Sequence, residues 1–355
     1  MKFVFKDKLI TSMLGVVPDE ESFFDDEVNN YSFPVNQTMR LKKVMGFNKH
    51  RLSKPESTVS DFAVQGIEYM LQNSWIEKEE IGALIVVTLC PDFFVPHISN
   101  IIHDRFRLGT DVLCVDLSQG CCGFIQGLME SFLILEHMSD KKVLLINGDL
   151  LSHKVSKRDR NDFPLIGDAV TISVIENGVS DDIYLELNTD GSGKDALIIP
   201  AGGFRTPSDA TTCVMTDQGD GNFRSLDNIH MDGAAVFNFV QREVPPMLER
   251  VFAEQEVKTD DFDLFLFHQP NKFMLKKLAE KVGIPEDRLP MNLVENYGNS
   301  SGACIPLTTV LNCREEMKNK KNKCCLSAFG SGLTWGVVII TLGNFKNCDM
   351  IEIPY

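Results

Sequence analysis

The sequence lacks any hydrophobic run long enough to cross a membrane. Its longest apolar stretches, such as ALIVVTLC at 83–90, are about half of the ~20 residues that a transmembrane helix needs, and they are typical of buried strands. The N-terminal stretch lacks the pattern of a secretory signal peptide, because Lys6, Asp7 and Lys8 interrupt its apolar residues. The sequence therefore predicts no membrane span and a cytoplasmic location.

Positive charge is also scarce. The chain has 35 Lys and Arg against 50 Asp and Glu, a net charge of −15. Phosphate binding needs a basic surface, so nucleic acid and anionic membrane are excluded as main partners, although a local basic patch could still serve an acidic partner. The hydrophobic fraction of 43% and the charged fraction of 24% are those of a globular enzyme with a large core.

No C-x-x-C motif occurs among the ten cysteines, which argues against a structural zinc site, and we expect no metal. Two pairs are adjacent instead, Cys121–Cys122 and Cys324–Cys325. In a chain without an export signal these thiols should be reduced. Most of them should be small buried hydrophobes.

Short apolar runs alternate with longer amphipathic segments, which predicts an α/β fold with largely parallel sheets. The loose repetition of this order indicates two similar halves, 1–178 and 179–355, joined at the turn-rich ENGVSDD of 176–182. The proline pair Pro245–Pro246 should kink or split the helix predicted at 235–255. Strands are predicted at 82–89, 110–117, 141–147, 169–176, 262–268, 324–330 and 336–343, and the other helices at 61–74, 122–138, 272–283 and 305–320.

Three polar residues lie at positions in the predicted fold that are typical of catalytic side chains. Cys121 follows a buried strand and a short turn at the start of a helix, where the helix dipole and free N–H groups favour a thiolate. His268 ends another buried strand, and Asn299 lies in a turn before a helix. The structural alternatives are a core cysteine, a hydrogen-bonded histidine and an N-cap asparagine. The glycine-rich 328–336 allows close backbone approach but is no phosphate loop.

Four segments in this order resemble the ketoacyl-acyl carrier protein synthase III family of condensing enzymes. VDLSQGCCGFIQGL at 115–128 is similar to the nucleophile segment, and the spacing from Asp116 selects Cys121 rather than Cys122. FLFHQPN and YGNSSGACIPL resemble the segments that carry the family's histidine and asparagine, here His268 and Asn299. AFGSGLTWG resembles the loop that supplies a backbone N–H to the oxyanion hole, here from Ser331.

The resemblance implies a thiolase-like fold, layered αβαβα, in a homodimer. It implies decarboxylative condensation of an acyl thioester with a malonyl thioester through an acyl-Cys121 intermediate. The N–H groups of Cys121 and Ser331 would bind the oxyanion, and His268 and Asn299 would stabilise the enolate left by carbon dioxide. No metal or redox cofactor is needed. A loop around Phe93–Val95 would reach into the pocket of the partner protomer.

One segment departs from the family. Around Gly46, Arg40 and Val44 stand near the positions of the tryptophan and arginine that hold coenzyme A in the family. This departure predicts an acyl donor carried on acyl carrier protein. Contacts to that acidic partner are predicted on the helix after His268, at Lys272, Lys276 and Lys277, with Lys281 further along.

Two other functions stay open on the sequence. Cys121 could pass its acyl group to a hydroxyl or amine without condensation, or the chain could be a non-catalytic partner subunit that keeps the fold. A papain-like hydrolase is disfavoured, because the residues that surround the cysteine in that class are absent.

Overall fold

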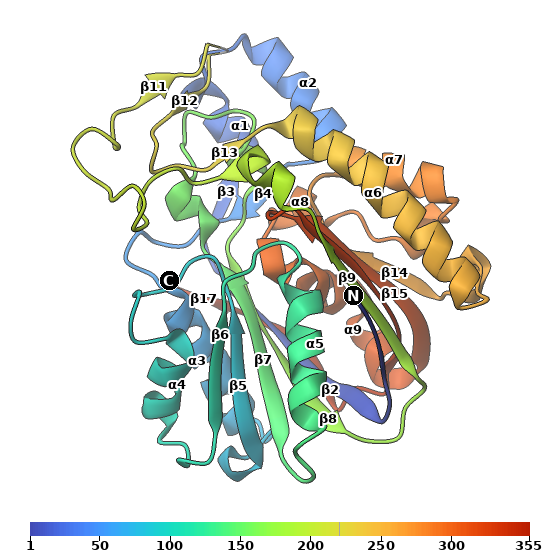
Figure 1. Cartoon of the computed structure of the whole chain (residues 1–355). Helices are drawn as coiled ribbons and strands as arrows, with labels where there is room; N and C mark the ends of the chain where they lie inside the picture. The colour runs from blue at the N-terminus through green and yellow to red at the C-terminus, as the bar shows by residue number, and fades with distance from the viewer. Residues whose placement is uncertain (220) are drawn as a thin grey trace.

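Two β-sheets form the framework of the protein in the computed structural model, which describes residues 1–219 and 221–355 (Figure 1). The six-stranded sheet has the order β17 (Asn347–Ile353), β2 (Lys8–Pro18), β8 (Ala169–Asn177), β7 (Lys142–Asp149), β5 (Ile81–Val87), β6 (Leu113–Leu117). The five-stranded sheet has the order β1 (Lys2–Phe5), β9 (Ile183–Thr189), β16 (Thr334–Gly343), β15 (Lys321–Gly330), β14 (Leu264–Phe267).

Helices cover the sheets in three layers. Two helices lie between the sheets, α5 (Gly123–Leu135) and α9 (Cys304–Asn319). The outer face of the six-stranded sheet packs against α3 (Val59–Gln72) and α4 (Ile98–Phe106), and that of the five-stranded sheet against α6 (Gly233–Glu254) and α7 (Lys272–Val282). Figure 1 shows these layers, which confirm the predicted αβαβα arrangement.

Strand residues alternate between these layers because successive side chains point to opposite faces of a sheet. In β5, Ile85 and Val87 pack in the central core, whereas Leu84 and Val86 pack under α3 and α4. β14 likewise sends Leu266 to the central core and its phenylalanines outward. Both strands are buried on two faces, so they read as continuous apolar runs in the sequence.

The strand directions differ from the expectation of largely parallel sheets. Parallel pairs are β17–β2, β5–β6, β5–β7 and β14–β15, whereas the other pairs of the two sheets are antiparallel. Segments that contain helices connect β5 with β6, β5 with β7 and β14 with β15, while β15 and β16 are joined by a turn too short for a crossover. The prediction therefore holds for the fold class but not for strand direction in the five-stranded sheet.

The chain passes from one sheet to the other between β8 and β9, at the junction predicted for residues 178 and 179. However, β1 lies in the five-stranded sheet, and β17 lies in the six-stranded sheet beside β2. Neither half of the sequence thus supplies all strands of its own sheet. The division into halves at this position is our proposal.

The proline pair does not split α6, contrary to one of the two predicted effects. Pro245 lacks the N–H that would bind the carbonyl of Gln241 one turn earlier. Lys281 Nζ of α7 donates to that carbonyl at 2.6 Å. A neighbouring helix therefore replaces the lost hydrogen bond, and the structure has one helix from Gly233 to Glu254.

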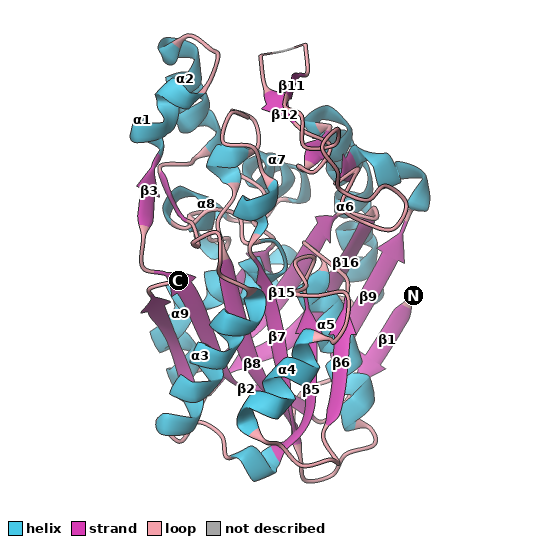
Figure 2. Cartoon of the chain, turned by 90° about the vertical axis from the view of Figure 1, so that its left-hand side faces the viewer, coloured by secondary structure: helices cyan, strands magenta, loops and turns pink. Residues whose placement is uncertain are grey.

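Shorter elements gather at one end of the two sheets (Figure 2). They comprise the helices α1 (Phe24–Glu27), α2 (Val35–Met45) and α8 (Leu293–Asn296), and the strand pairs β3 (Glu21–Phe23) with β4 (Lys49–Arg51), β10 (Leu197–Ile198) with β13 (His230–Met231), and β11 (Thr216–Asp217) with β12 (Phe223–Arg224). The carboxyl ends of β5, β6, β7 and β14 also face this end, which is where open α/β sheets place their sites.

Candidate active site

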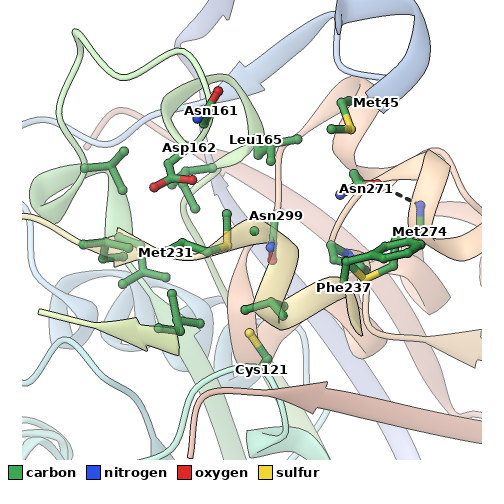
Figure 3. A pocket seen from close by; sticks show the side chains of 18 of the residues that line it. Met45, Cys121, Asn161, Asp162, Leu165, Met231, Phe237, Asn271, Met274 and Asn299 are labelled. Atoms are coloured by element: carbon green, nitrogen blue, oxygen red, sulfur yellow. Dashed lines mark hydrogen bonds between the residues drawn. The ribbon is translucent and has the colours of Figure 1, made fainter. Parts of the chain in front are cut away.

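A cavity of about 720 Å³ lies at this end, and Cys121, Asn299 and Ser331 are part of its lining (Figure 3). The close view places Asn299 above Cys121, with Met45 and Asn161 on the far side of the space. His268 is outside the lining and is 2% exposed. The fold thus brings Cys121, Asn299 and Ser331 from three distant segments to one cavity, and His268, from a fourth, is buried against the backbone of Ser301.

Local structure explains the position of Cys121. β6 ends at Leu117, and α5 begins at Gly123. The Gly123 N–H donates to Gly120 O at 2.6 Å, which closes the turn that carries Cys121. Asp116, the residue that set the register, accepts the N–H groups of Ile98 and Ser99 at 2.8 and 3.1 Å. Its observed role is therefore to hold the start of α4.

The thiol of Cys121 is not a thiolate, contrary to our expectation. Its pKa is raised to about 11, chiefly by burial and also by the carboxylate of Asp149. The hydroxyl of Ser301 and the N–H groups of Cys121 and Ser331 act in the opposite direction. Desolvation is the larger effect, because removing a thiolate from water costs more than these donors return. A proton must therefore leave Cys121 before it can attack.

The turn between β15 and β16 touches Cys121. A Cβ atom at Gly330 would lie 2.5 Å from Cys121 Cβ and 2.9 Å from its Sγ, so only glycine fits there. This close approach lets the Ser331 N–H point at the thiol beside the N–H of Cys121 itself. An acyl group bound to this sulfur would place its carbonyl oxygen next to the two N–H groups, which makes them candidate donors of an oxyanion hole.

Asn299 is fixed by its backbone. Its N–H donates to Leu165 O at 2.6 Å, and its carbonyl accepts the Gly167 N–H at 3.1 Å. A Cβ at Gly167 would lie 1.9 Å from Tyr297 O, so the two segments meet only because residue 167 is glycine. The side-chain Oδ1 accepts the Ser301 N–H at 2.9 Å, which leaves the amide NH₂ group of Asn299 as a donor.

His268 is a neutral imidazole. Burial lowers its pKa to about 3, and a hydrogen bond with the backbone of Ser301 opposes this shift. Its ring meets Phe329 edge-on, with centroids 5.7 Å apart. A neutral imidazole carries one N–H and can donate one hydrogen bond, as the predicted role in enolate stabilisation requires.

Cys122, the alternative to Cys121, lies elsewhere. It is 1% exposed, packs in the central core between the sheets and donates to Ala328 O at 3.7 Å. Cys304, Cys313, Cys324, Cys325 and Cys348 are also buried, as predicted for most of the cysteines. The position of Cys122 agrees with the register that selected Cys121.

Sequence reasoning missed Asp149 and Ser301. Asp149 ends β7, two residues beyond the predicted strand, and is fully buried. Ser301 stands two residues after Asn299 with φ of 53°, a left-handed conformation that is uncommon for serine. A lone carboxylate at the end of a buried strand could have signalled the first, whereas nothing in the sequence indicates the second.

The rest of the lining is mostly apolar, and it includes Leu41 and Met45 of α2, the helix that departs from the family pattern. Arg40 of the same helix is exposed, and so is Val44. Arg160 lines the cavity, and its guanidinium lies 3.3 Å from the centroid of Phe33. The lining thus contains an arginine that the sequence reading did not single out.

The lysines predicted to meet a carrier protein lie on α7 and form ion pairs. Lys272 pairs with Glu295 at 3.5 Å, Lys276 with Glu286 at 3.4 Å, and Lys277 with Glu280 at 2.6 Å. Their charge is therefore partly compensated.

In the described part of the chain, no helix is long and apolar enough to cross a membrane.

The comparisons with known proteins agree with this geometry. Residues 115–193 match the family of 3-oxoacyl-[acyl-carrier-protein] synthase III, and residues 252–342 match its C-terminal part. A putative 3-oxoacyl-[acyl-carrier-protein] synthase 3 of Campylobacter jejuni is 32% identical over 98% of this chain and 96% of its own length. A β-ketoacyl-[acyl-carrier-protein] synthase III of Natranaerobius thermophilus is 31% identical over 83% of this chain and 88% of its own.

The crystal structure of 3-oxoacyl-(acyl-carrier protein) synthase from Burkholderia xenovorans LB400 superposes with a TM-score of 0.91 at 29% identity, covering 99% of both chains. The layered sheets with a cysteine at the head of the central helix α5 define a thiolase-fold enzyme. Within that class, the chain belongs to the 3-oxoacyl-[acyl-carrier-protein] synthase III family.

Proposed function

We propose that the protein catalyses decarboxylative condensation of an acyl thioester with a malonyl thioester, giving a 3-ketoacyl product. The observation that carries this proposal is the thiol of Cys121 in the lining of the cavity, faced by the N–H groups of Cys121 and Ser331. Cys121 attacks the acyl thioester, and these two N–H groups hold the oxyanion of the tetrahedral intermediate. Family membership supports this reaction.

His268 and Asn299 serve the second half-reaction. When the malonyl thioester loses carbon dioxide, negative charge develops on its thioester oxygen. The neutral imidazole and the amide NH₂ group each offer a hydrogen bond to that oxygen without adding a full charge. The enolate then attacks acyl-Cys121, which releases the 3-ketoacyl product. No metal or redox cofactor takes part, because loss of carbon dioxide drives the condensation.

The test is intact-protein mass spectrometry after incubation with a panel of acyl thioesters, followed by product analysis with a malonyl thioester. Cys121→Ala should abolish acylation, while the matched control Cys122→Ala should retain it. The reaction with the malonyl thioester should release carbon dioxide and a 3-ketoacyl product. Acylation that persists in Cys121→Ala would refute the assignment of the nucleophile.

The same experiment separates the alternatives. An acyltransferase would acylate Cys121 and pass the group to a hydroxyl or amine without releasing carbon dioxide. A non-catalytic partner subunit would not be acylated by any donor. The neutral donors beside the thiol favour condensation over simple transfer, since transfer needs no enolate-stabilising pair.

The acyl donor is proposed to be acyl carrier protein, which would dock at Lys272, Lys276 and Lys277 beside the mouth of the cavity. Asn271 and Phe273, which flank Lys272, line the cavity, so a carrier held at this helix start would have a short path to the thiol. The ion pairs of these lysines with neighbouring glutamates partly neutralise this surface.

Acylation of Cys121 by one acyl group, presented on carrier protein and on coenzyme A, decides between the donors. The carrier-bound donor should be preferred and should lose its advantage as salt rises, because exposed charges are screened over ~8–10 Å. The charge-reversal variant Lys272→Glu/Lys276→Glu should weaken use of the carrier and leave coenzyme A unaffected. Equal use of both donors with no salt effect would contradict the proposed docking surface.

The protein is further proposed to be a cytoplasmic homodimer. Phe93, Phe94 and Val95 follow β5 and are 60%, 65% and 78% exposed, and the ring of Phe94 lies 5.2 Å from that of the exposed Phe204. Adjacent large apolar side chains of this exposure are typical of a surface that a partner covers. A second copy of the chain is the partner that the family resemblance suggests.

A further inference from the structure

A buried carboxyl group lies close to the thiol of Cys121. Asp149 is fully buried at the end of β7, and its Oδ1 accepts the Leu89 N–H at 2.7 Å and the Thr88 hydroxyl at 3.0 Å. Its Oδ2 has no hydrogen bond of normal length among the described residues. Burial raises the pKa of Asp149 to about 6, so the group changes its charge close to neutral pH.

Ser301 lies between this carboxyl group and the thiol. Its hydroxyl donates to Cys121 Sγ at 4.0 Å, a weak O–H···S hydrogen bond, and rotation of the hydroxyl toward Asp149 would let its oxygen accept from the thiol instead. The same side chain interacts with the carboxyl group of Asp149 and lowers its pKa, while it also lowers the pKa of Cys121. The left-handed backbone of Ser301 and its N–H bond to Asn299 Oδ1 hold the hydroxyl in this position.

The other polar groups at the site are poor proton acceptors. The pKa of His268 is about 3, so its neutral ring binds a proton too weakly. An amide such as that of Asn299 does not take a proton at all. Because the Cys121 thiol is protonated at neutral pH, its acylation needs a group that accepts the proton.

We propose that Asp149 accepts the proton of Cys121 through the hydroxyl of Ser301 during acylation. This inference rests on the proposed function, in which Cys121 attacks an acyl thioester. As the sulfur attacks the carbonyl carbon, its proton passes to Ser301 Oγ, and the Ser301 hydroxyl proton passes to the carboxylate. When the thioester C–S bond breaks, the proton returns by the same route to the leaving thiolate. The step yields acyl-Cys121 and a free thiol, with no net uptake of protons.

The thiols and the imidazole that face this relay carry no charge near neutral pH. Burial raises the pKa values of Cys90, Cys122 and Cys304, the last to about 12, so these thiols stay protonated. His268 stays neutral. The carboxylate of Asp168 raises the pKa of Cys90, and it accepts hydrogen bonds from the hydroxyl groups of Ser53 and Ser152. The pH dependence near neutral pH should therefore come from Asp149.

A purely structural role for Asp149 predicts the opposite result. Its carboxylate raises the pKa of Cys121, so replacing Asp149 with a neutral residue would make the thiolate easier to form. If Asp149 only held Thr88 and Leu89 in place, Asp149→Asn would keep an oxygen for both donors and acylation would become faster. A role as proton acceptor makes the same variant slower. The sign of the change distinguishes the two roles.

The test measures single-turnover acylation of Cys121 by mass spectrometry at about pH 5–9, with the acyl thioester that acylates the wild type best. The wild-type rate should rise through a pKa near 6, and Asp149→Asn should lose this rise and react about 10²–10⁴ times more slowly. Ser301→Ala breaks the relay and leaves the carboxyl group of Asp149 in place, so it should also slow acylation. If Asp149→Asn does not fold, Ser301→Ala provides the test. Ser300→Ala is the control, since Ser300 Oγ contacts Cys304 Sγ at 3.9 Å.

An unchanged or faster rate in Asp149→Asn and in Ser301→Ala, with the wild-type pH profile, would overturn the relay. Failure of the proposed function has a different signature, in which no acyl thioester labels the wild-type Cys121. Acylation that depends on Cys121 but not on Asp149 or Ser301 would keep the function and reject the relay. The two hypotheses are therefore tested separately by the same measurement.

Discussion

Replacing His268 should change how the stability of the fold depends on pH. The histidine has a pKa of about 3 in the folded protein against 6.5 for a free side chain. Below pH 6.5 the unfolded chain binds a proton that the folded protein excludes, so stability is lost as pH falls. At about 1.4 kcal/mol per pH unit, the loss reaches about 2 kcal/mol at pH 5 and about 5 kcal/mol near pH 3.

Asp149 works in the opposite direction over the same range. Its pKa is raised from 3.8 to about 6, so the folded protein keeps a proton that the unfolded chain has released. Its contribution is full below pH 3.8 and is lost as pH rises through 6, at a cost of about 3 kcal/mol. When the pH falls from 7 to 5, protonation of Asp149 adds about 1.4 kcal/mol to the stability of the fold, which offsets most of the loss caused by His268. The wild type alone therefore cannot reveal either residue.

Urea unfolding of the wild type, His268→Asn and Asp149→Asn at pH 7 and pH 5, at one protein concentration, separates the two effects. When the pH falls from 7 to 5, His268→Asn should lose about 2 kcal/mol less stability than the wild type, because it has no buried histidine to protonate. Asp149→Asn should lose about 1.4 kcal/mol more than the wild type, because it has no carboxyl group that gains a proton in the fold. If His268→Asn shows the pH dependence of the wild type, the imidazole is not held neutral by burial and the reasoning fails.

Three further outcomes are expected. Gly330→Ala should slow acylation of Cys121 by at least about tenfold. The added Cβ would force Ser331 and the thiol apart and weaken an interaction worth ~10²–10³ in rate. A wild-type rate in the mass-spectrometric assay would contradict the close contact. His268→Ala and Asn299→Ala should still form acyl-Cys121 but release carbon dioxide from a malonyl thioester on the order of 10²–10³ times more slowly, and wild-type condensation in both would refute their role. Phe94→Asp should shift the protein to a monomer in size-exclusion chromatography, with Lys318→Asp at the partly exposed end of α9 as the control. An unchanged elution volume would remove Phe94 from the interface.

Much of the fold could be read from hydrophobic runs. The buried strands β5, β7, β8 and β14 and the helices α3, α5, α7 and α9 fall at the predicted positions, because their apolar patterns are long and sharply bounded. β2 was missed although it is 11 residues long and mostly buried. Its sequence KLITSMLGVVP contains Thr11 and Ser12, which are buried although they are polar. These two residues interrupt the apolar run by which a buried strand is recognised in a sequence.

The sequence offers candidate site residues where residue type determines chemistry, and offers none where only geometry does. Cys121, His268 and Asn299 stand in recognisable motifs, and the fold brings their segments together. Asp149 and Ser301 are common residues in ordinary strand and turn sequences, and what distinguishes them is their burial beside the thiol. The protonated state of Cys121 was also missed, because the helix start is visible in the sequence whereas the desolvation of the sulfur is not.

The exchange of β1 and β17 between the two sheets ties the fold to the order of protein synthesis. β17 completes the six-stranded sheet at the edge beside β2, although almost the whole described chain separates these two strands in the sequence. Until it emerges, β2 presents a row of unpaired backbone groups to any other strand nearby. β1 likewise waits for its partner β9, since five strands of the six-stranded sheet lie between them in the sequence. A nascent chain in which β17 has not yet emerged would thus expose the backbone groups of β2, and pairing with β17 covers them.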